Sequence, residues 1–183
     1  MGSAFPISLL HDVRITPLKR HEDDRGALTE IFRANWPTGT DPVQWNMVRS
    51  QPGTMRGFHV HATHTDYLLI AEGAMFLGMR DLRKGSPTAG MVDTLTITAE
   101  EPFAVTLPTG IGHGFCFVQP SMHIYAVSHY WDMADEFACR FDDPEIGIDW
   151  PVASPLLSPR DDAAGTLAEM IAAYEARIAE LNR

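Results

Sequence analysis

The chain has 183 residues, of which 45% are apolar and 21% are charged, and this is enough for one domain with a full hydrophobic core. Fourteen basic and 24 acidic residues give a formal charge of −10, which disfavours binding to nucleic acid or anionic lipid, and no apolar run is long enough to span a membrane. With only two cysteines and no apolar secretory signal at the N-terminus, we expect a folded cytoplasmic protein without a disulfide framework.

Eight short segments rich in β-branched, aromatic or alternating residues predict strands. In chain order they are Val43–Ser50, Gly57–His61, Tyr67–Glu72, Met75–Asp81, Thr94–Thr98, Phe103–Leu107, Gly114–Val118 and His123–Trp131. Turn residues such as Gln51-Pro52-Gly53 and Pro108-Thr109-Gly110 separate them, at a spacing typical of a sandwich or jelly roll. The pattern predicts an all-β fold.

Two further segments follow the strands. Asp132, Asp135 and Glu136 form an acidic cluster, which we expect to be a solvated surface loop. At about residues 163–182 the apolar residues recur every three or four positions, which predicts an amphipathic C-terminal helix. We expect its apolar stripe to pack on the outside of the β domain rather than form a coiled coil, because only about two to three heptads are available.

The densest group of histidines lies in the segment Arg56–Tyr67. In a strand, residues two apart project from the same face, so His59 and His61 point together and Asp66 on the next strand can meet them. A later histidine, His113, begins another strand beside three glycines that allow close backbone approach. These four residues are therefore candidates for one pocket.

This pattern resembles the two signature motifs of the cupin superfamily: His-x-His, an acid, Gly73, and then Pro108-x-Gly-x-x-His113. Asp66 stands where glutamate is usual, and Phe117 where the closing asparagine is usual. In cupins that keep these positions, the residues matching His59, His61, Asp66 and His113 hold a divalent metal inside a small β-barrel. Many cupins have lost the metal, so a metal-free barrel without a cofactor is the favoured expectation and a divalent ion the alternative.

A longer resemblance covers about residues 20–161 and is to the dTDP-4-dehydrorhamnose 3,5-epimerase family. Its motifs occur here in the same order: Asp24-Arg25-Gly26, Val43-Gln44-Trp45-Asn46, Met55 through His59, Asp81 through Gly90, Leu107 through Phe115, Asp143 through Pro151 and Leu157 through Asp161. The resemblance implies a homodimeric cupin jelly roll that acts on nucleotide-linked 4-keto-6-deoxy sugars. We therefore expect residues 1–183 to form a single cupin-type domain with its core at about 20–161 and the helix behind it.

The resemblance also implies roles for individual residues. His59 matches the base that removes a proton next to the 4-keto group, and Asp161 matches the carboxylate that orients it. Further implied substrate-binding positions are Arg25, Gln44, Asn46, Arg56, His113 and Trp131. Arginine suits the diphosphate, because its planar fork donates two hydrogen bonds to phosphate oxygens.

Three features depart from the family pattern. The family's acidic tyrosine falls on Trp131, so the candidate acid is the neighbouring Tyr130, if a bulge turns it inward, or His129. The family's lysine falls on Asp66, which a bound metal would compensate, although a metal-bound His59 could not also act as the base. Ala27 and Leu28 replace a pair of aromatics, so the nucleotide need not be dTDP.

Together these observations predict an epimerase or isomerase of a nucleotide-linked 4-keto sugar that works by enolisation next to the ketone. Because the acidic tyrosine is displaced, we expect inversion at one carbon rather than two. Two alternatives remain open: a metal-dependent cupin enzyme acting on another small molecule, and a cupin that binds a sugar nucleotide without catalysis.

Overall fold

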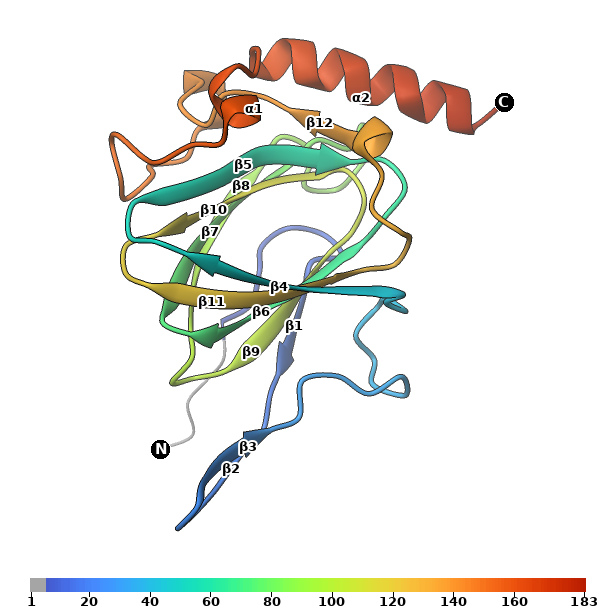
Figure 1. Ribbon diagram of the computed structural model, residues 1–183. Helices are drawn as coiled ribbons and strands as arrows, with labels where there is room; N and C mark the ends of the chain where they lie inside the picture. The colour runs from blue at the N-terminus through green and yellow to red at the C-terminus, as the bar shows by residue number, and fades with distance from the viewer. Residues whose placement is uncertain (1–5) are drawn as a thin grey trace.

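The computed structural model describes residues 6–183, so the first five residues of the expected domain lie outside the described part (Figure 1). Twelve strands occur in this part: β1 (Arg14–Pro17), β2 (Arg20–Asp23), β3 (Gly26–Thr29), β4 (Gln44–Ser50), β5 (Thr54–His61), β6 (Asp66–Glu72), β7 (Ala74–Asp81), β8 (Val92–Thr98), β9 (Phe103–Leu107), β10 (Ile111–Phe117), β11 (Ser121–Val127) and β12 (Glu136–Ala138). The helical elements are η1 (Met133–Asp135), η2 (Pro144–Ile146), α1 (Pro159–Asp162) and α2 (Leu167–Leu181).

Two five-stranded sheets face each other and enclose the interior of a barrel (Figure 1). The first sheet has the order β1-β9-β6-β11-β4, and the second has the order β12-β5-β10-β7-β8. The strands pair antiparallel, while β2 and β3 form a separate hairpin that projects away from the barrel (Figure 1). The predicted all-β cupin jelly roll with a C-terminal helix is confirmed.

All eight predicted strands are present, but the predicted end of the last one at Trp131 is wrong. Strand β11 ends at Val127, because the next residue, Ser128, turns to the loop before β6: its backbone N–H bonds the Thr65 carbonyl oxygen at 3.1 Å, and its hydroxyl accepts from the Thr65 N–H at 2.9 Å. Four short strands were not predicted, since β1, β2, β3 and β12 have only three or four residues each.

The main core lies between the two sheets. Side chains of both sheets meet there, among them Leu68, Leu77, Met79, Ile97, Val105 and Phe117, all of which are buried. This apolar layer occupies one part of the barrel interior and leaves the rest to the polar residues described below.

The C-terminal helix covers the outside of the second sheet, as predicted. Alternation along β5 places Phe58 and Val60 outward, where they pack with Leu167, Met170 and Tyr174 of α2. The helix starts later than position 163, because Thr166 caps it: its hydroxyl accepts from the Glu169 N–H, and the Glu169 carboxylate accepts from the Thr166 N–H. None of the helices in the described part is both long and apolar enough to cross a bilayer.

Candidate active site

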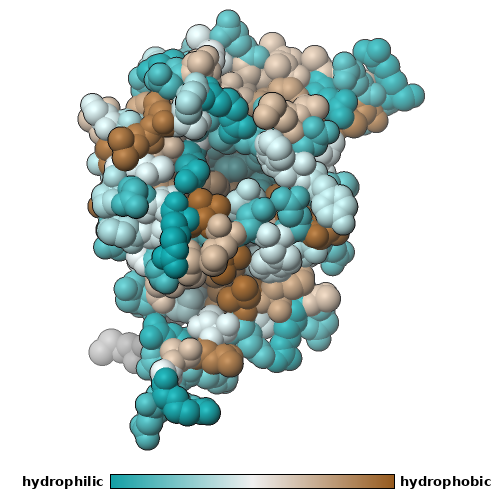
Figure 2. All heavy atoms as spheres, in the orientation of Figure 1, coloured by the Kyte–Doolittle hydropathy of each residue, from teal (hydrophilic) through white to brown (hydrophobic). Residues whose placement is uncertain are grey.

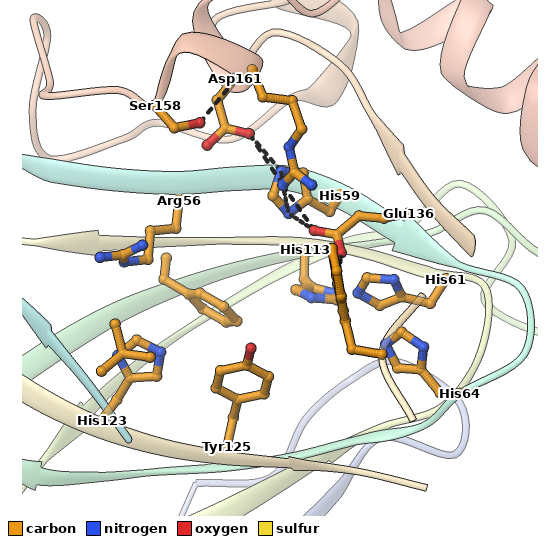
Figure 3. A pocket seen from close by; sticks show the side chains of 14 residues that line it. Arg56, His59, His61, His64, His113, His123, Tyr125, Glu136, Ser158 and Asp161 are labelled. Atoms are coloured by element: carbon orange, nitrogen blue, oxygen red, sulfur yellow. Dashed lines mark hydrogen bonds and ion pairs between the residues drawn. The ribbon is translucent and has the colours of Figure 1, made fainter. Parts of the chain in front are cut away.

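A cavity of about 370 Å³ opens between the two sheets (Figure 3). Five of the eight histidines of the chain line it. The complete lining is Val48, Arg56, His59, His61, His64, His113, Phe115, His123, Tyr125, Trp131, Glu136, Ser158, Arg160 and Asp161. Barrel strands therefore supply most of the wall, the loop before β6 supplies His64, and the segment after β11 supplies the rest.

The pairing of β5 with β10 places two predicted histidines side by side. His59 and His113 are register partners, and the strands come close here because Gly57 and Gly114 have no side chains. A Cβ added to Gly57, whose φ is +107°, would lie 2.8 Å from the Cα of Gly114. Since the outer face of β5 lies under α2, its inner face directs His59 and His61 into the cavity, as the spacing predicted.

His59 lies between two carboxylates. Its Nε2 is 2.7 Å from Oδ1 of Asp161, and its Nδ1 is 3.2 Å from Oε1 of Glu136. Arg160 completes the group: its Nη2 is 2.9 Å from Nε2 of His59 and donates to Oε1 of Glu136 at 2.8 Å. An imidazole with a carboxylate at each nitrogen is held in one orientation.

Asp161 owes its position to a local cap. Ser158 is the N-cap of α1, its hydroxyl accepts from the Asp161 N–H at 3.1 Å, and Pro159 occupies the first helical position. Burial alone would raise the pKa of the Asp161 carboxyl, but the hydrogen bond with His59 and the nearby charges hold it below the usual value. Asp161 is therefore an ionised partner of His59 at neutral pH.

The predicted solvated acidic loop is wrong for two of its three members. Glu136 lies in the cavity wall, where its carboxylate accepts from Arg160 and from the Trp131 indole N–H. Asp135 is only 3% exposed and accepts from the N–H groups of Ala62 and Thr63 at 3.1 and 3.0 Å. Pairing of β12 with the edge of β5 buries both residues, whereas Asp132 remains exposed as the N-cap of η1.

A second group gathers at one end of the cavity, around Asp66. Its carboxylate lies 3.6 Å from Nε2 of His61 and 3.9 Å from Nε2 of both His64 and His113. Burial raises the pKa of Asp66 well above its usual value, lowers the pKa of His113 to about 4, and lowers the pKa of His61 well below its usual value. Within residues 6–183, two groups of ligand atoms could hold an ion: His61 with Asp66 and His113, and His61 with His64 and Asp135. His59 belongs to neither group.

The opposite wall belongs to β11 and carries a tyrosine that the sequence reasoning missed. Figure 3 shows the Tyr125 hydroxyl directed into the cavity, with His123 beside it. Their rings stack with centroids 5.9 Å apart. Burial raises the pKa of Tyr125, so this phenol is protonated at neutral pH. The sequence did contain a signal for Tyr125, because it lies two residues after His123 in a predicted strand and so projects from the same face.

The structure does not bring all predicted residues into the cavity. Tyr130 is 78% exposed and does not line the cavity, and His129 is also exposed, because both follow the end of β11. Arg25 sits on the projecting hairpin, where it pairs with Asp23 at 2.6 Å. The residues predicted to bind substrate that do line the cavity are Arg56, His113 and Trp131.

Gln44 and Asn46 support the cavity rather than line it. Oε1 of Gln44 accepts from the Trp131 backbone N–H at 3.0 Å, and its Nε2 donates to Oδ1 of Asn46 at 3.1 Å. This chain of contacts fixes the position of Trp131, whose indole reaches Glu136.

Comparison with known proteins places this site in a family. The family model described as dTDP-4-dehydrorhamnose 3,5-epimerase matches residues 8–169, a span that includes every residue lining the cavity. The chain belongs to the dTDP-4-dehydrorhamnose 3,5-epimerase family. The resemblance stated from the motifs is thereby confirmed.

Two curated relatives and one solved structure illustrate the similarity to other dTDP-4-dehydrorhamnose 3,5-epimerase family members. The dTDP-4-dehydrorhamnose 3,5-epimerase of Neisseria gonorrhoeae is 33% identical over 87% of this chain, and the dTDP-4-dehydrorhamnose 3-epimerase of Streptomyces niveus is 41% identical over 69%. The matched region spans only 51% and 63% of the lengths of these two relatives. NovW of Streptomyces spheroides, a 4-keto-6-deoxy sugar epimerase from the novobiocin gene cluster, superposes with a TM-score of 0.82 at 32% identity, covering 94% of this chain and 89% of NovW.

Proposed function

We propose that the protein is an isomerase that epimerises a nucleotide-linked 4-keto-6-deoxy sugar at a carbon next to the ketone. One observation carries the proposal: the His59–Asp161 pair faces the Tyr125 hydroxyl across the cavity. The substrate class is supported by the relatives, since the Streptomyces niveus protein is named a dTDP-4-dehydrorhamnose 3-epimerase and NovW a 4-keto-6-deoxy sugar epimerase.

In this mechanism His59 is the base. With the proton of the neutral ring on Nε2 and donated to Asp161, Nδ1 accepts the proton from the carbon next to the ketone. Glu136, 3.2 Å from Nδ1, then accepts a hydrogen bond from the new N–H. The two carboxylates stabilise the positive charge that the ring gains as the enolate forms.

Tyr125 is the acid. His59 projects from β5 and Tyr125 from β11, which belong to opposite sheets, so a sugar held between them has one residue at each face of its ring. Tyr125 gives its phenolic proton to the carbon from the face opposite His59, which inverts that carbon. His59 then releases its proton to solvent, and the tyrosinate recovers one. A single pair of this kind supports inversion at one carbon.

Arg56 is the proposed diphosphate ligand inside the protomer. It lines the cavity, its Nε donates to Ser50 Oγ at 3.2 Å, and it has no carboxylate partner among residues 6–183. A free guanidinium fork in a chain with a formal charge of −10 is a local site for a doubly charged phosphate group.

We further propose a homodimer in the cytoplasm. The edge strand β4 exposes Trp45 and Met47 by 40% and 66%, and Figure 2 shows apolar side chains on the face formed by β4 and β11. Arg25 lies on the projecting hairpin and not in its own cavity, so a substrate-binding role for it would require the cavity of a second copy. The two cysteines, Cys116 and Cys139, are unpaired and buried, in keeping with a reducing compartment. Light scattering should give twice the 20.3 kDa chain mass; a monomer would contradict this.

Deuterium uptake tests the catalytic proposal. Protein in heavy water is mixed with a panel of dTDP-, UDP- and GDP-linked 4-keto-6-deoxy sugars, and the product mass is followed over time. We expect each product molecule to gain one deuterium for at least one of the three nucleotide-linked sugars. His59→Asn should lower the exchange rate about 10³-fold, because general acid–base groups contribute on this scale.

Two tyrosine variants separate the role of Tyr125 from a structural effect. Tyr125→Phe should keep exchange, since His59 can return deuterium to the face it deprotonates, but lose inversion by about 100-fold. Tyr130→Phe, outside the cavity, is the matched control and should behave as wild type. Absence of exchange with every sugar would overturn the proposal and favour a cupin enzyme with another substrate or a binding protein.

A further inference from the structure

The Asp66 carboxylate has an unusual set of neighbours. It is 6% exposed, and among the described residues no donor comes within hydrogen-bond distance of it. Its nearest polar neighbours are the Nε2 atoms of His61, His64 and His113, at 3.6 to 3.9 Å. A buried carboxylate without donors is costly, so a proton or a cation that joins this group of acceptors stabilises it.

Two of the three imidazoles are fixed with a lone pair toward Asp66. Nδ1 of His113 lies 3.0 Å from the Ile111 carbonyl oxygen, to which it donates its proton. Nδ1 of His64 lies 3.2 Å from Oδ2 of Asp135 and donates to it in the same way. The proton of each neutral ring is therefore on Nδ1, and Nε2 is left as an acceptor.

The third imidazole, His61, is buried between these rings. Its ring stacks on that of His64 with centroids 3.9 Å apart and lies 5.2 Å from that of His113 (Figure 3). Its Nδ1 is buried and has no hydrogen-bond partner. Packing thus fixes the His61 ring, but its Nδ1 lacks a hydrogen bond. A buried polar atom without a partner is a feature of ligand-binding sites.

Asp135 supports the cluster from behind. Its oxygens already accept from the N–H groups of Ala62 and Thr63 and from the Thr63 hydroxyl, at 2.5 to 3.1 Å, so they are occupied. A carboxylate that holds the far nitrogen of a histidine is the usual outer partner of a metal-bound imidazole.

We propose that His61, His64, Asp66 and His113 bind one divalent first-row transition metal ion of the Zn²⁺ class. Three imidazoles and one carboxylate suit such an ion. Two ligand atoms on a tetrahedral Zn²⁺ lie about 3.3 Å apart, a few tenths of an ångström less than the 3.6 to 3.9 Å between the Asp66 carboxylate and each Nε2 atom. The ligand atoms of His61, Asp66 and His113 already lie within 4.8 Å of one another, and His64 is the fourth ligand on the Asp66 side.

This set differs from the one expected from the sequence, because His64 replaces His59. The nitrogens of His59 are already engaged by Asp161, Arg160 and Glu136. Because His59 is not a ligand in this set, the protein can bind an ion and still use His59 as the base. The ligand set expected from the sequence did not allow both. When bound, the ion would supply positive charge within the cavity. The site itself does not depend on the proposed epimerase activity.

Calorimetric titration of Zn²⁺ into tag-free, chelator-stripped full-length protein tests the proposal without any substrate. We expect one ion per chain and a rise in the thermal unfolding temperature. Asp66→Asn and His113→Gln should each weaken binding by about 100-fold or more, and Asp135→Asn by about 10-fold to 100-fold. The Asp66→Asn change preserves side-chain shape, which limits any effect on folding.

His123→Gln is the matched control, because it replaces another buried cavity histidine that is not part of the cluster. It should bind Zn²⁺ as wild type does. Circular dichroism establishes that each variant is folded. The proposal is overturned if folded wild-type protein takes up no Zn²⁺ in a saturable way, if Asp66→Asn binds as tightly as wild type, or if His123→Gln loses as much affinity as Asp66→Asn.

Discussion

Two buried aspartates lie at the outer ends of the consecutive strands β6 and β7, which belong to opposite sheets, and have opposite surroundings. Asp66 begins β6 beside the cavity, and Asp81 ends β7 at the turn that follows. Asp81 is fully buried and accepts hydrogen bonds from the side chains of Arg83, Ser86 and Thr88 at 2.6 to 2.9 Å. Asp66 is almost as deeply buried but faces imidazole lone pairs instead of donors.

The difference shows in their acidities. Burial alone would raise the pKa of Asp81, but its hydrogen bonds bring the value well below the usual range, whereas burial raises the pKa of Asp66 without compensation. A buried carboxylate surrounded by donors contributes to stability. One surrounded by acceptors lowers stability until a proton or a cation joins it, which is characteristic of a functional site.

Among the variants that test this comparison, Asp81→Asn should change the free energy of unfolding most. The substitution removes the buried carboxylate 2.8 Å from the half-buried Arg83 guanidinium, which, among the residues that the structure describes, keeps only the more exposed Asp12 carboxylate at 3.6 Å. We expect a loss of about 3 kcal/mol in the free energy of unfolding, the scale of a broken buried ion pair. Urea unfolding in the presence of a chelator measures it. A loss below about 1 kcal/mol would mean that the Asp81 network contributes little.

The next largest effect is the change of this stability difference with pH. The pKa of Asp81 is lower in the folded than in the unfolded chain, so its stabilisation is complete above the unfolded pKa near 3.8 and is lost as pH falls toward the folded pKa. The stability gap between wild type and Asp81→Asn should therefore narrow by about 1.4 kcal/mol per pH unit below pH 4. A gap that stays constant down to pH 3 would contradict this assignment.

Asp66→Asn in metal-free protein should change the free energy of unfolding least. Its pKa is higher in the folded chain, so the carboxyl lowers stability as pH rises above the unfolded value near 3.8. At pH 7 the variant should equal wild type or exceed it by up to about 1 kcal/mol, by urea unfolding with chelator. Destabilisation as large as that of Asp81→Asn would remove the distinction between the two aspartates.

Features with a regular period or a long motif could be predicted from the sequence. Alternation along β5 correctly directed His59 and His61 inward, and the three-to-four-residue period predicted α2. The pairing of His59 with Asp161, 102 positions away, came from the family motifs and not from any local pattern.

The features that were missed depend on contacts without a local signature. Asp135 and Glu136 are buried because a strand of three residues, β12, pairs with the edge of β5. His64 lies in a loop and turns inward because Asp135 holds its Nδ1. Tyr125 was missed because the family's acidic tyrosine matched Trp131, which lies beyond the end of β11 at Val127.

The division of the cavity wall between barrel strands and the later segment has an evolutionary consequence. The chain from β5 to β11 carries the imidazoles, Asp66 and Tyr125, and so defines what the cavity can hold. The segment after Val127 carries Glu136, Arg160 and Asp161, and so fixes the orientation of the His59 ring. The two parts can change independently, so the residues that hold a substrate and the residues that orient His59 can evolve through separate, small sets of substitutions.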